Sequence, residues 1–430
     1  MLPIAARASS GRASVRRWMI FVLFLAIAAR LIYAAAIYTP DLAAFESGDY
    51  ILYRIGAEHI RTVGDFTNSL FLVRPPLFPL WVAFFNINPP LIIGANILMG
   101  ALTAVLGMVF ARQLHPDERL ARGVGIILAL EPTMVLYSAF LGPEPLANIL
   151  LLIALIAVLR AMQPESSFGW SIAAGAALMG SAYVRPSTYL FWIAIGAWWL
   201  VKNRHQWRRV FAFVTVCAIG SAAWTLHNAR VFNTPSFSTV APYTMVYYHA
   251  ASVERIATDQ PIEQVYVSIN ERVAAYAGLE FETIDEGTRH SFLAAPPNVQ
   301  DALNRTAWEI FSANPLITLA TFPIGFARMY GLFPDVINAG TLLIAAFNVV
   351  FVLGALIGVV IALRQRRWML LISTCLPIGY YTAGTLIVKS AGMDTRERSM
   401  LEPMIAVLFT AAVLSIWDHW RNRRTTPQHA

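Results

Sequence analysis

Residues 340–363 read GTLLIAAFNVVFVLGALIGVVIAL, a run of 24 residues without a charged side chain, and Arg364, Arg366 and Arg367 follow it. At 1.5 Å per residue, a helix of this length measures about 36 Å, enough to cross about 30 Å of bilayer hydrocarbon. An apolar run that ends in a basic cluster is typical of a membrane span that ends at the cytoplasmic surface. This stretch therefore predicts a chain that crosses a membrane.

The composition of the whole chain supports the same prediction. Hydrophobic residues make up 57% and charged residues 13% of the 430 positions, against about 45 to 50% and about 25% in soluble domains. These values exclude a cytosolic enzyme, a fibre and a disordered scaffold. The net charge of +7 indicates no nucleic-acid partner, because the basic residues lie next to the apolar runs. Cys217 and Cys375 both lie inside such runs, so neither a disulfide framework nor a thiolate metal site is expected.

Ten apolar runs are candidate membrane spans, although several are short for a crossing. They lie at 18–38, 91–111, 122–140, 145–162, 169–184, 187–201, 210–229, 340–363, 368–388 and 400–417. Together they predict an all-α polytopic membrane protein, a bundle of about ten transmembrane helices with helical loops on its outer face.

The distribution of charge predicts the orientation of these spans. If the N-terminus is cytoplasmic, the connections on that side carry 18 basic residues and only four acidic residues. Nearly all other carboxylates lie on the opposite side, in the two long segments 39–90 and 230–339. Short cytoplasmic loops of membrane proteins are rich in Lys and Arg, so both termini are expected in the cytoplasm.

This orientation divides the chain into five parts. They are a cytoplasmic basic tail at 1–17, an N-terminal transmembrane catalytic module at 18–229 that includes the outer loop 39–90, an outer loop region at 230–339, C-terminal transmembrane helices at 340–418 and a cytoplasmic tail at 419–430. The first span has a basic leader, so a cleavable signal peptide is an alternative. Its removal would discard Arg30, a charge inside a span, and such a charge usually has a partner in the helix bundle.

The first outer segment contains the stretch SGDYILYRIGAEHI at 47–60. Its aromatic and apolar residues recur at helical spacing, so residues 49–60 predict a short helix that lies on the membrane. Asp49 falls in the first turn of this helix, where the helix dipole favours a carboxylate. The position suits either a simple helix cap or a catalytic acid. Tyr53 and Arg54 in the same stretch are candidate substrate contacts.

Arg74 and Arg185 each precede a proline at the end of an apolar stretch. A residue before proline avoids helical angles, so both side chains are expected at the edge of the membrane. There an arginine either extends toward lipid headgroups or offers its planar guanidinium to one specific phosphate. Glu144, between two prolines, begins a span on the same outer face. It is either a partner of the helix dipole or a second acid that faces the same site as Asp49.

The turn before the last span is crowded with Lys389, Asp394, Arg396, Glu397 and Arg398. One interpretation is a solvated loop whose charges pair with one another. The other is a set of groups that includes phosphate-binding arginines, Arg396 and Arg398.

The long outer segment offers aromatic side chains. Tyr243, Tyr247 and Tyr248 are candidate sugar contacts, because sugars stack on aromatic rings. An aromatic belt at the membrane interface is an equally good interpretation. The histidines show no metal-ligand spacing such as HExxH, so no metal site is predicted.

The outer face thus combines two carboxylates with several arginines at membrane depth. A lipid-phosphate substrate needs arginine near the headgroup plane, and a carboxylate base activates a hydroxyl group for attack at a sugar carbon. The alternative function is a lipid or solute transporter or flippase, for which inverted repeats and broken spans are expected. No internal repeat is detected, and only Arg30 and Glu131 are clear charges inside spans. A non-catalytic assembly scaffold is a third reading.

Several stretches, in their order along the chain, resemble the glycosyltransferase C superfamily. More narrowly they are similar to the bacterial branch of the dolichyl-phosphate-mannose protein mannosyltransferase and aminoarabinose lipid A transferase group. The stretches are SGDYILYRIGAEHI, RPPLFPLWVA, GPEP, YVRPST, WTLHNARVFNTPSFSTVAPY and RERSMLEPMIAVLF. The resemblance covers residues 18–418 and is weakest between 250 and 335.

The resemblance implies an enzyme of the bacterial inner membrane with its active site on the outer face. Such an enzyme transfers a sugar from a polyprenyl-phosphate carrier to a glycan, lipid or protein acceptor and inverts the anomeric carbon. It also implies that Asp49 is the general base and that Glu144 orients the acceptor or helps to bind a divalent ion where one is used. Arg74, Arg185 and Arg398 match the arginines associated with the carrier phosphate. Two departures are Leu77-Phe78, where Gly-Tyr is frequent, and Pro145 after Glu144.

Overall fold

The computed structural model describes residues 4–38, 50–334 and 336–425, and every regular element in these ranges is helical. The predicted all-α polytopic fold is confirmed. Asp49, the predicted general base, lies outside the described residues.

Seven helices of the described chain are long and apolar enough to cross a membrane. They are α1 (Ile4–Ile37), α5 (Pro89–Leu114), α8 (Glu144–Ala161), α11 (Trp207–Phe232), α17 (Ala339–Arg364), α18 (Trp368–Val388) and α19 (Glu402–Thr425). Two bent pairs bring the number to as many as nine within the described ranges. These are α6 (Glu118–Leu130) with α7 (Pro132–Ser138), bent by 50°, and α15 (Pro297–Ala313) with α16 (Pro315–Met329), bent by 104°.

Two of the ten expected spans are shorter than a full crossing. The runs at 169–184 and 187–201 form α9 (Gly169–Val184), with 16 residues, and α10 (Phe191–Lys202), with 12 residues. A short 3-10 helix, η2 (Pro186–Thr188), separates them. Pro186 has no N–H group and disfavours a helical conformation at Arg185, so α9 ends there.

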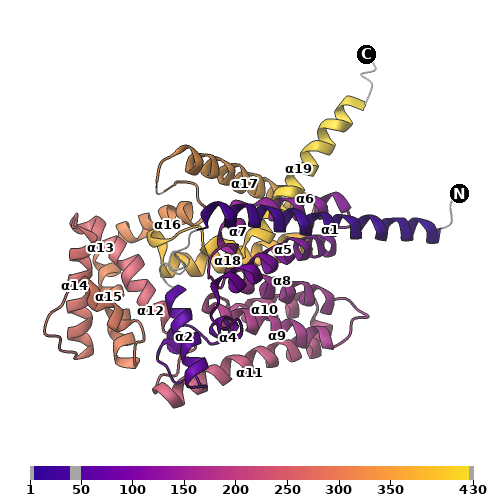
Figure 1. Ribbon diagram of the computed structural model, residues 1–430. Coiled ribbons are helices and arrows are strands. Elements are labelled where there is room, and N and C mark those ends of the chain that lie inside the picture. Colours follow the sequence, from indigo (N-terminus) through magenta and orange to yellow (C-terminus); the bar gives the residue numbers. More distant parts are fainter. Residues whose placement is uncertain (1–3, 39–49, 335, 426–430) are drawn as a thin grey trace.

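The basic connections of the bundle lie together at one end. Arg119 forms an ion pair of 2.8 Å with Asp418, and Arg209 donates hydrogen bonds to the carbonyl groups of Ala161, Gln163, Pro164 and Ser166. We call the end formed by the connections 115–117, 162–168 and 203–206 the basic end, because these connections and the adjoining helix ends carry Arg112, Arg119, Arg122, Arg160, Lys202, Arg204, Arg208 and Arg209. The chain termini extend from this end (Figure 1).

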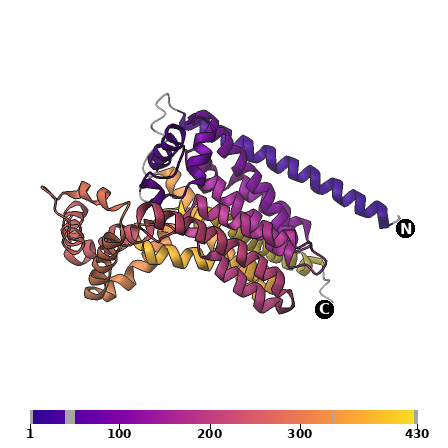
Figure 2. The same ribbon diagram turned by 90° about the horizontal axis from the view of Figure 1, so that it is seen from below.

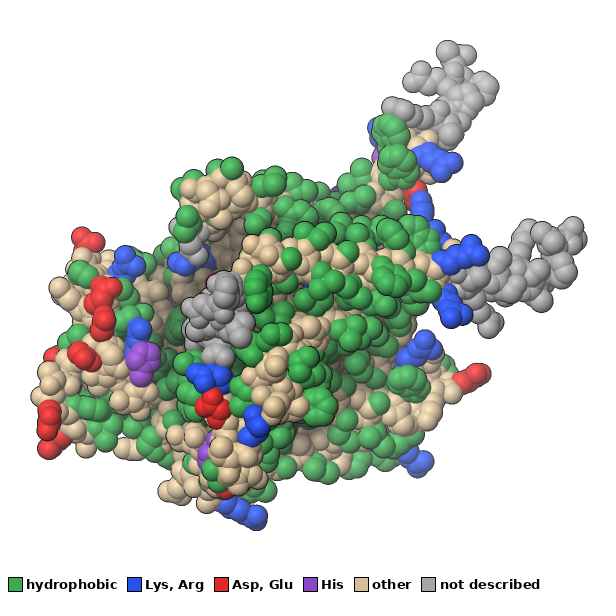
Figure 3. Space-filling view, viewed as in Figure 1, with side chains coloured by type: hydrophobic (Ala, Val, Ile, Leu, Met, Phe, Trp, Pro, Cys, Tyr) green, Lys and Arg blue, Asp and Glu red, His purple; other side chains and the backbone are tan. Residues whose placement is uncertain are grey.

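The opposite end, which we call the acidic end, carries a group of short helices: α12 (Val240–Thr244), the π-helix η4 (Met245–Ala250), α13 (Ala251–Thr258), α14 (Ile262–Ala277) and α15. They enclose a second hydrophobic cluster around Val246, Ile269 and Leu303. Residues 240–313 hold ten carboxylates and four arginines. In both ribbon views, these helices lie at the end of the molecule away from the chain termini (Figure 1 and Figure 2). Acidic side chains gather on them in Figure 3.

The break between α6 and α7 is stabilised by a buried charge from α1. Pro132 cannot donate to the carbonyl of Leu128, four residues earlier. Arg30, which is fully buried, replaces the missing donors: its guanidinium bonds the carbonyls of Leu128 (3.3 Å) and Ala129 (3.0 Å) and the hydroxyl of Ser138 (3.1 Å). Arg30 therefore has the partners in the bundle that a charge at this depth requires.

We expect Arg30→Leu to lower the free energy of unfolding by about 3 kcal/mol, because it leaves buried carbonyl groups without donors. Unfolding in mixed detergent micelles measures this difference. Arg160→Leu is the matched control, because Arg160 is exposed at the basic end of α8. Equal stability of the two variants would contradict the role given to Arg30.

Candidate active site

Glu144 is the first residue of α8 and is fully buried at the acidic end. A proline on each side suits the start of a helix, where no intrahelical donor is needed, and the helix dipole favours a carboxylate there. Asn96 of α5 fixes the approach to this turn, because its amide donates to the carbonyls of Phe140 (2.8 Å) and Gly142 (3.1 Å). A Cβ at position 142 would lie 2.1 Å from the Glu144 carboxylate and 2.9 Å from the Tyr50 hydroxyl, so a larger residue there would displace both groups.

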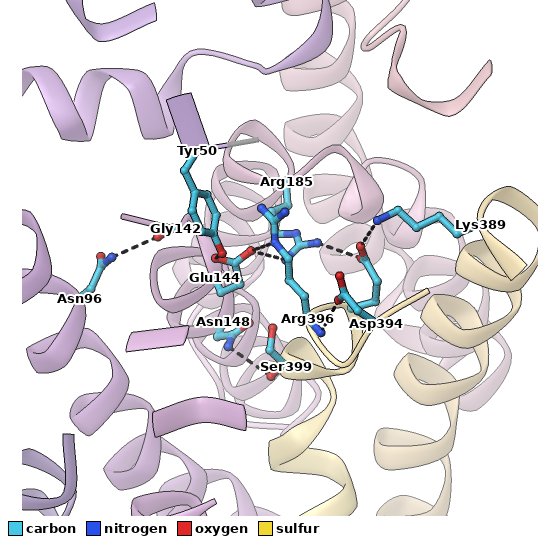
Figure 4. A network of polar contacts seen from close by, with 11 residues as sticks. Tyr50, Asn96, Gly142, Glu144, Asn148, Arg185, Lys389, Asp394, Arg396 and Ser399 are labelled. Carbon is cyan, nitrogen blue, oxygen red and sulfur yellow. Dashed lines mark hydrogen bonds and ion pairs between the residues drawn. The ribbon is translucent and has the colours of Figure 1, made fainter. Parts of the chain in front are cut away.

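Three elements from distant parts of the chain meet at the Glu144 carboxylate (Figure 4). Arg185, at the end of α9, donates from Nη1 to Oε1 at 3.0 Å. Arg396, in the turn before α19, donates from Nε to the same oxygen. The hydroxyl of Tyr50, the first residue of α2 (Tyr50–Thr62), donates to Oε2 at 3.4 Å. Glu144 therefore accepts from two cations and a phenol.

A second carboxylate extends this arrangement. Glu397 accepts from Arg185 at 2.9 Å and from Lys389 at 2.6 Å. Asp394 accepts from the backbone N–H of Arg396 at 2.7 Å. We call Glu144, Arg185, Lys389, Asp394, Arg396 and Glu397 the charged cluster; Figure 4 labels all of these except Glu397. Its three carboxylates balance its three cations.

The electrostatics of the charged cluster keep its ion pairs intact. Burial alone would raise the pKa of Glu397, but the charges of Lys389 and Arg185 outweigh it and hold this pKa well below its usual range. Burial alone would lower the pKa of Lys389, but Glu397 and Asp394 raise it above its ordinary value. Both groups are therefore ionised at neutral pH.

The helix α2 presents two tyrosine rings to arginine side chains. The guanidinium carbon of Arg396 lies 4.7 Å from the ring centre of Tyr50, and that of Arg74 lies 5.5 Å from the ring centre of Tyr53. Tyr53 is almost fully buried. Spacing of three residues places both rings on one face of α2. Arg74 therefore stacks on the same face of α2 as Arg396 of the charged cluster.

The other predicted residues near α2 lie to one side of this arrangement. Arg54 forms an ion pair of 2.6 Å with Glu58 on α2 itself. A small cavity is lined by Tyr50, Tyr53, Arg54 and Leu141, together with Val82, Ile87, Pro89 and Ile92. This cavity borders Tyr50, the first residue of α2, which directly follows Asp49 in the chain.

The three candidate tyrosines of the outer segment do not gather at one site. Tyr243 and Tyr247 are buried in the second hydrophobic cluster, and the Tyr247 hydroxyl donates to Asn270 at 2.6 Å. Tyr248 is 37% exposed, and its ring centre lies 5.2 Å from Nζ of Lys389. Of these three rings, Tyr248 is therefore the one that borders the charged cluster.

Arg398 lies in a different environment from Arg396. It is fully buried, and its guanidinium donates to Glu402 (2.5 Å), Glu131 (3.1 Å), Thr133 (2.9 Å), Asn348 (3.0 Å) and the carbonyl of Tyr330 (2.5 Å). We call these residues the Arg398 network. The structure thus places the predicted phosphate ligand Arg398 in an internal network.

The structure also brings forward residues that were not among the predicted site residues. Lys389 and Glu397 join Arg185 and Arg396, whereas the sequence pattern alone also suited a solvated loop. The signal that could have found them is the alternation of charges immediately before an apolar span. Among the described residues, no group of three or more His, Cys, Asp and Glu side chains is arranged to hold a metal ion.

The depressed pKa of Glu397 gives a pH-dependent stability. Such a group stabilises the fold fully above its unfolded pKa, about 4.5, and loses this contribution as pH falls toward the folded pKa. We expect the stability advantage of the native chain over Glu397→Gln to be constant between about pH 5.5 and 8 and to fall by about 1.4 kcal/mol per pH unit below about 4.5. Thermal unfolding across pH 3.5 to 8 measures it.

Glu309→Gln is the control for this series, because Glu309 is exposed on α15. Its difference from the native chain should stay small at every pH. An advantage over Glu397→Gln that persists unchanged down to pH 3.5 would contradict the assigned ion pairs.

Comparison with known proteins shows a likeness in structure. No protein-family model and no curated protein matches the sequence. The chain superposes on the oligosaccharyltransferase AglB from Archaeoglobus fulgidus, solved with an inhibitory peptide and a dolichol-phosphate, with a TM-score of 0.55 and 14% identity. The match covers 96% of this chain and 51% of AglB, so the chain spans about half the length of that protein.

A second match is ArnT from Cupriavidus metallidurans bound to undecaprenyl phosphate, with 14% identity over 98% of this chain and 82% of ArnT. Its TM-score of 0.38 is too low to support a structural argument. AglB and ArnT both belong to the glycosyltransferase C superfamily. The likeness to AglB shows that the chain shares the fold of the matched half of that protein.

Proposed function

We propose that this chain is a membrane glycosyltransferase that moves a sugar from a polyprenyl-phosphate donor to an acceptor and inverts the anomeric carbon. The observation that carries the proposal is the charged cluster, which places Arg185 and Arg396 beside Glu144 at the acidic end of a bundle with this fold. The acidic end would face the outside of a bacterial inner membrane, because the basic end has the composition of cytoplasmic loops. The dolichol-phosphate and the inhibitory peptide in the AglB structure support a lipid-phosphate donor and a separate acceptor.

The arginines would bind and stabilise the departing prenyl phosphate. The charged cluster is balanced by its own carboxylates, so an incoming phosphate needs positive charge from outside it. Arg74, which stacks on Tyr53, would lie beside the charged cluster as a further arginine for the phosphate. Arg396 is the cation of the cluster that also stacks on Tyr50, and Arg185 holds both Glu144 and Glu397. Arg398 is left out of the phosphate site, because its donors are engaged in the Arg398 network.

One general base is sufficient for this reaction. A phosphate bound by arginines is a good leaving group, so no general acid is needed. Asp49 would take the proton of the acceptor hydroxyl as that oxygen attacks the anomeric carbon. Glu144, which accepts from two arginines, suits orientation of the site more than proton transfer. Asp49 directly precedes Tyr50, whose hydroxyl contacts Glu144.

The sugar and the acceptor would lie between α2 and the π-helix η4. Tyr248 offers an exposed ring next to Lys389 for stacking against a sugar. Tyr53 and Arg54 line the cavity beside the start of α2. Tyr243 and Tyr247 support the wall behind Tyr248. The site draws on the segment 18–229 and also on Lys389, Arg396 and Glu397 from the C-terminal part.

Asp49→Asn should lower the turnover of the donor by a factor of about 10² to 10⁴, the usual contribution of a general base. The assay is release of free undecaprenyl phosphate from an undecaprenyl-phosphate sugar by purified protein in nanodiscs. Glu46→Gln, in the same outer segment, is the control and should retain activity. Turnover of Asp49→Asn close to that of the native chain would remove Asp49 from the mechanism. Movement of intact donor across vesicles without release would favour a flippase.

Arg396→Lys should weaken binding of undecaprenyl phosphate about 10-fold to 100-fold, because a lysine cannot bridge Glu144 and a phosphate with a planar fork. Native mass spectrometry with this lipid measures the affinity. Arg289→Lys, a stacked arginine on the acidic-end helices, is the control. An unchanged affinity, with an effect confined to acceptor kinetics, would show that Arg396 does not bind the phosphate.

A further inference from the structure

Two buried residues next to the charged cluster have no part in the proposed chemistry. Arg398 belongs to the same 3-10 helix as Glu397, η7 (Glu397–Met400), and follows Arg396 by two residues. Asn148 lies one helical turn after Glu144 on α8 and donates from Nδ2 to the carbonyl of Ser399 at 3.2 Å. Figure 4 shows Asn148 and Ser399 beside Glu144 and Arg396.

These contacts fasten the turn 395–399 from both sides. On one side, α8 holds it at two points, through Glu144 to Arg396 and through Asn148 to Ser399. On the other side, the Arg398 network connects it to the α6–α7 break, to α17 and to α19. Within the turn, the N–H of Arg398 donates to the carbonyl of Thr395 and the N–H of Ser399 to that of Arg396, both at 3.2 Å.

Burying a charged side chain to hold a turn in place carries a large desolvation free energy. Replacing a buried ion pair by apolar side chains is often neutral or stabilising, so the Arg398 network is not needed for stability alone. The network instead fixes the position and the orientation of the backbone at Arg398, because a planar guanidinium bound to several acceptors can be arranged in few ways. That backbone carries Arg396, whose side chain must reach the Glu144 carboxylate and the Tyr50 ring together.

We infer that Arg398 and Asn148 are positioning residues that set Arg396 against Glu144 and Tyr50. The predicted effect on catalysis rests on the proposed function. The positioning of Arg396 by Arg398 and Asn148 does not. A displacement of about 1 Å at such a site is enough to lower the rate about 100-fold. The buried contacts of Arg398 therefore fix the position of Arg396 through the turn 395–399.

The test compares Asn148→Leu and Arg398→Lys with the native chain in nanodiscs without substrate. Asn148→Leu keeps a similar volume and removes one hydrogen bond, so it should fold. Hydrogen–deuterium exchange of peptides that cover 393–401 should become about tenfold faster in both variants, with exchange in α14 and α15 unchanged. Arg272→Lys, which alters an ion pair with Glu254 on the acidic-end helices, is the control and should leave 393–401 unchanged.

Exchange at 393–401 that stays at the native rate in a folded Asn148→Leu would overturn the inference. If Arg398→Lys loses protection throughout the chain, Asn148→Leu alone decides the outcome. If Arg398 instead binds the phosphate, Arg398→Lys should weaken binding of undecaprenyl phosphate without faster exchange, which also overturns it. The exchange result stands even if the native chain transfers no sugar, so failure of the proposed function is seen separately in the transfer assay.

Where transfer is measured, a positioning role predicts a specific kinetic change. Asn148→Leu should lower kcat about tenfold or more while KM for the donor changes less than about threefold, because Arg396 remains present but is less well directed. A rise in donor KM with native kcat would place Asn148 in substrate binding and contradict the inference.

Discussion

A charge surrounded by hydrocarbon and protein is tolerated only when it is paired, and Glu131 meets this constraint in a way that organises the bundle. Its carboxylate caps α7, where it accepts from the N–H of Met134 at 2.7 Å, and binds Arg398 at 3.1 Å. Arg30 bonds the carbonyls exposed by the same break. The break at Glu131-Pro132 therefore joins α1, α17 and α19 to the short helix α7, and the chain leaves α7 toward Glu144.

The charged cluster at the acidic end follows from this internal arrangement. One route leads along the chain from α7 to the turn that Asn96 holds, and it ends at Glu144. The other leads through Arg398 to the turn that carries Arg396. The two routes meet at the ion pair between Arg396 and Glu144. Because both partners are fixed from the membrane interior, the charged cluster can hold its geometry without a ligand, as the proposed electrostatic stabilisation of a departing phosphate would require.

Much of this fold is accessible from the sequence, because apolar length and the placement of Arg and Lys follow directly from the bilayer. The shortness of α9 and α10 is less accessible, since two apolar runs separated by Arg185-Pro186 suit either full or partial spans. In the site, the prolines beside Glu144 and Arg185 correctly indicate turns at span ends. The RER stretch at 396–398 does not show that Arg396 contacts Glu144 while Arg398 contacts Glu131. That difference arises from the 3-10 turn and from contacts with residues more than 250 positions earlier in the chain. Tyr247 and Tyr248 are adjacent in sequence, and only packing separates a buried ring from an exposed one.

The most direct test of the account is an experimental structure of the full chain in nanodiscs with undecaprenyl phosphate. The account predicts the phosphate at the acidic end, within hydrogen-bond distance of Arg396 and close to Arg74 and Arg185, with Arg398 still bonded to Glu131 and Glu402. A phosphate bound at the basic end, near Arg119 or Arg209, or one in direct contact with Arg398, would contradict it.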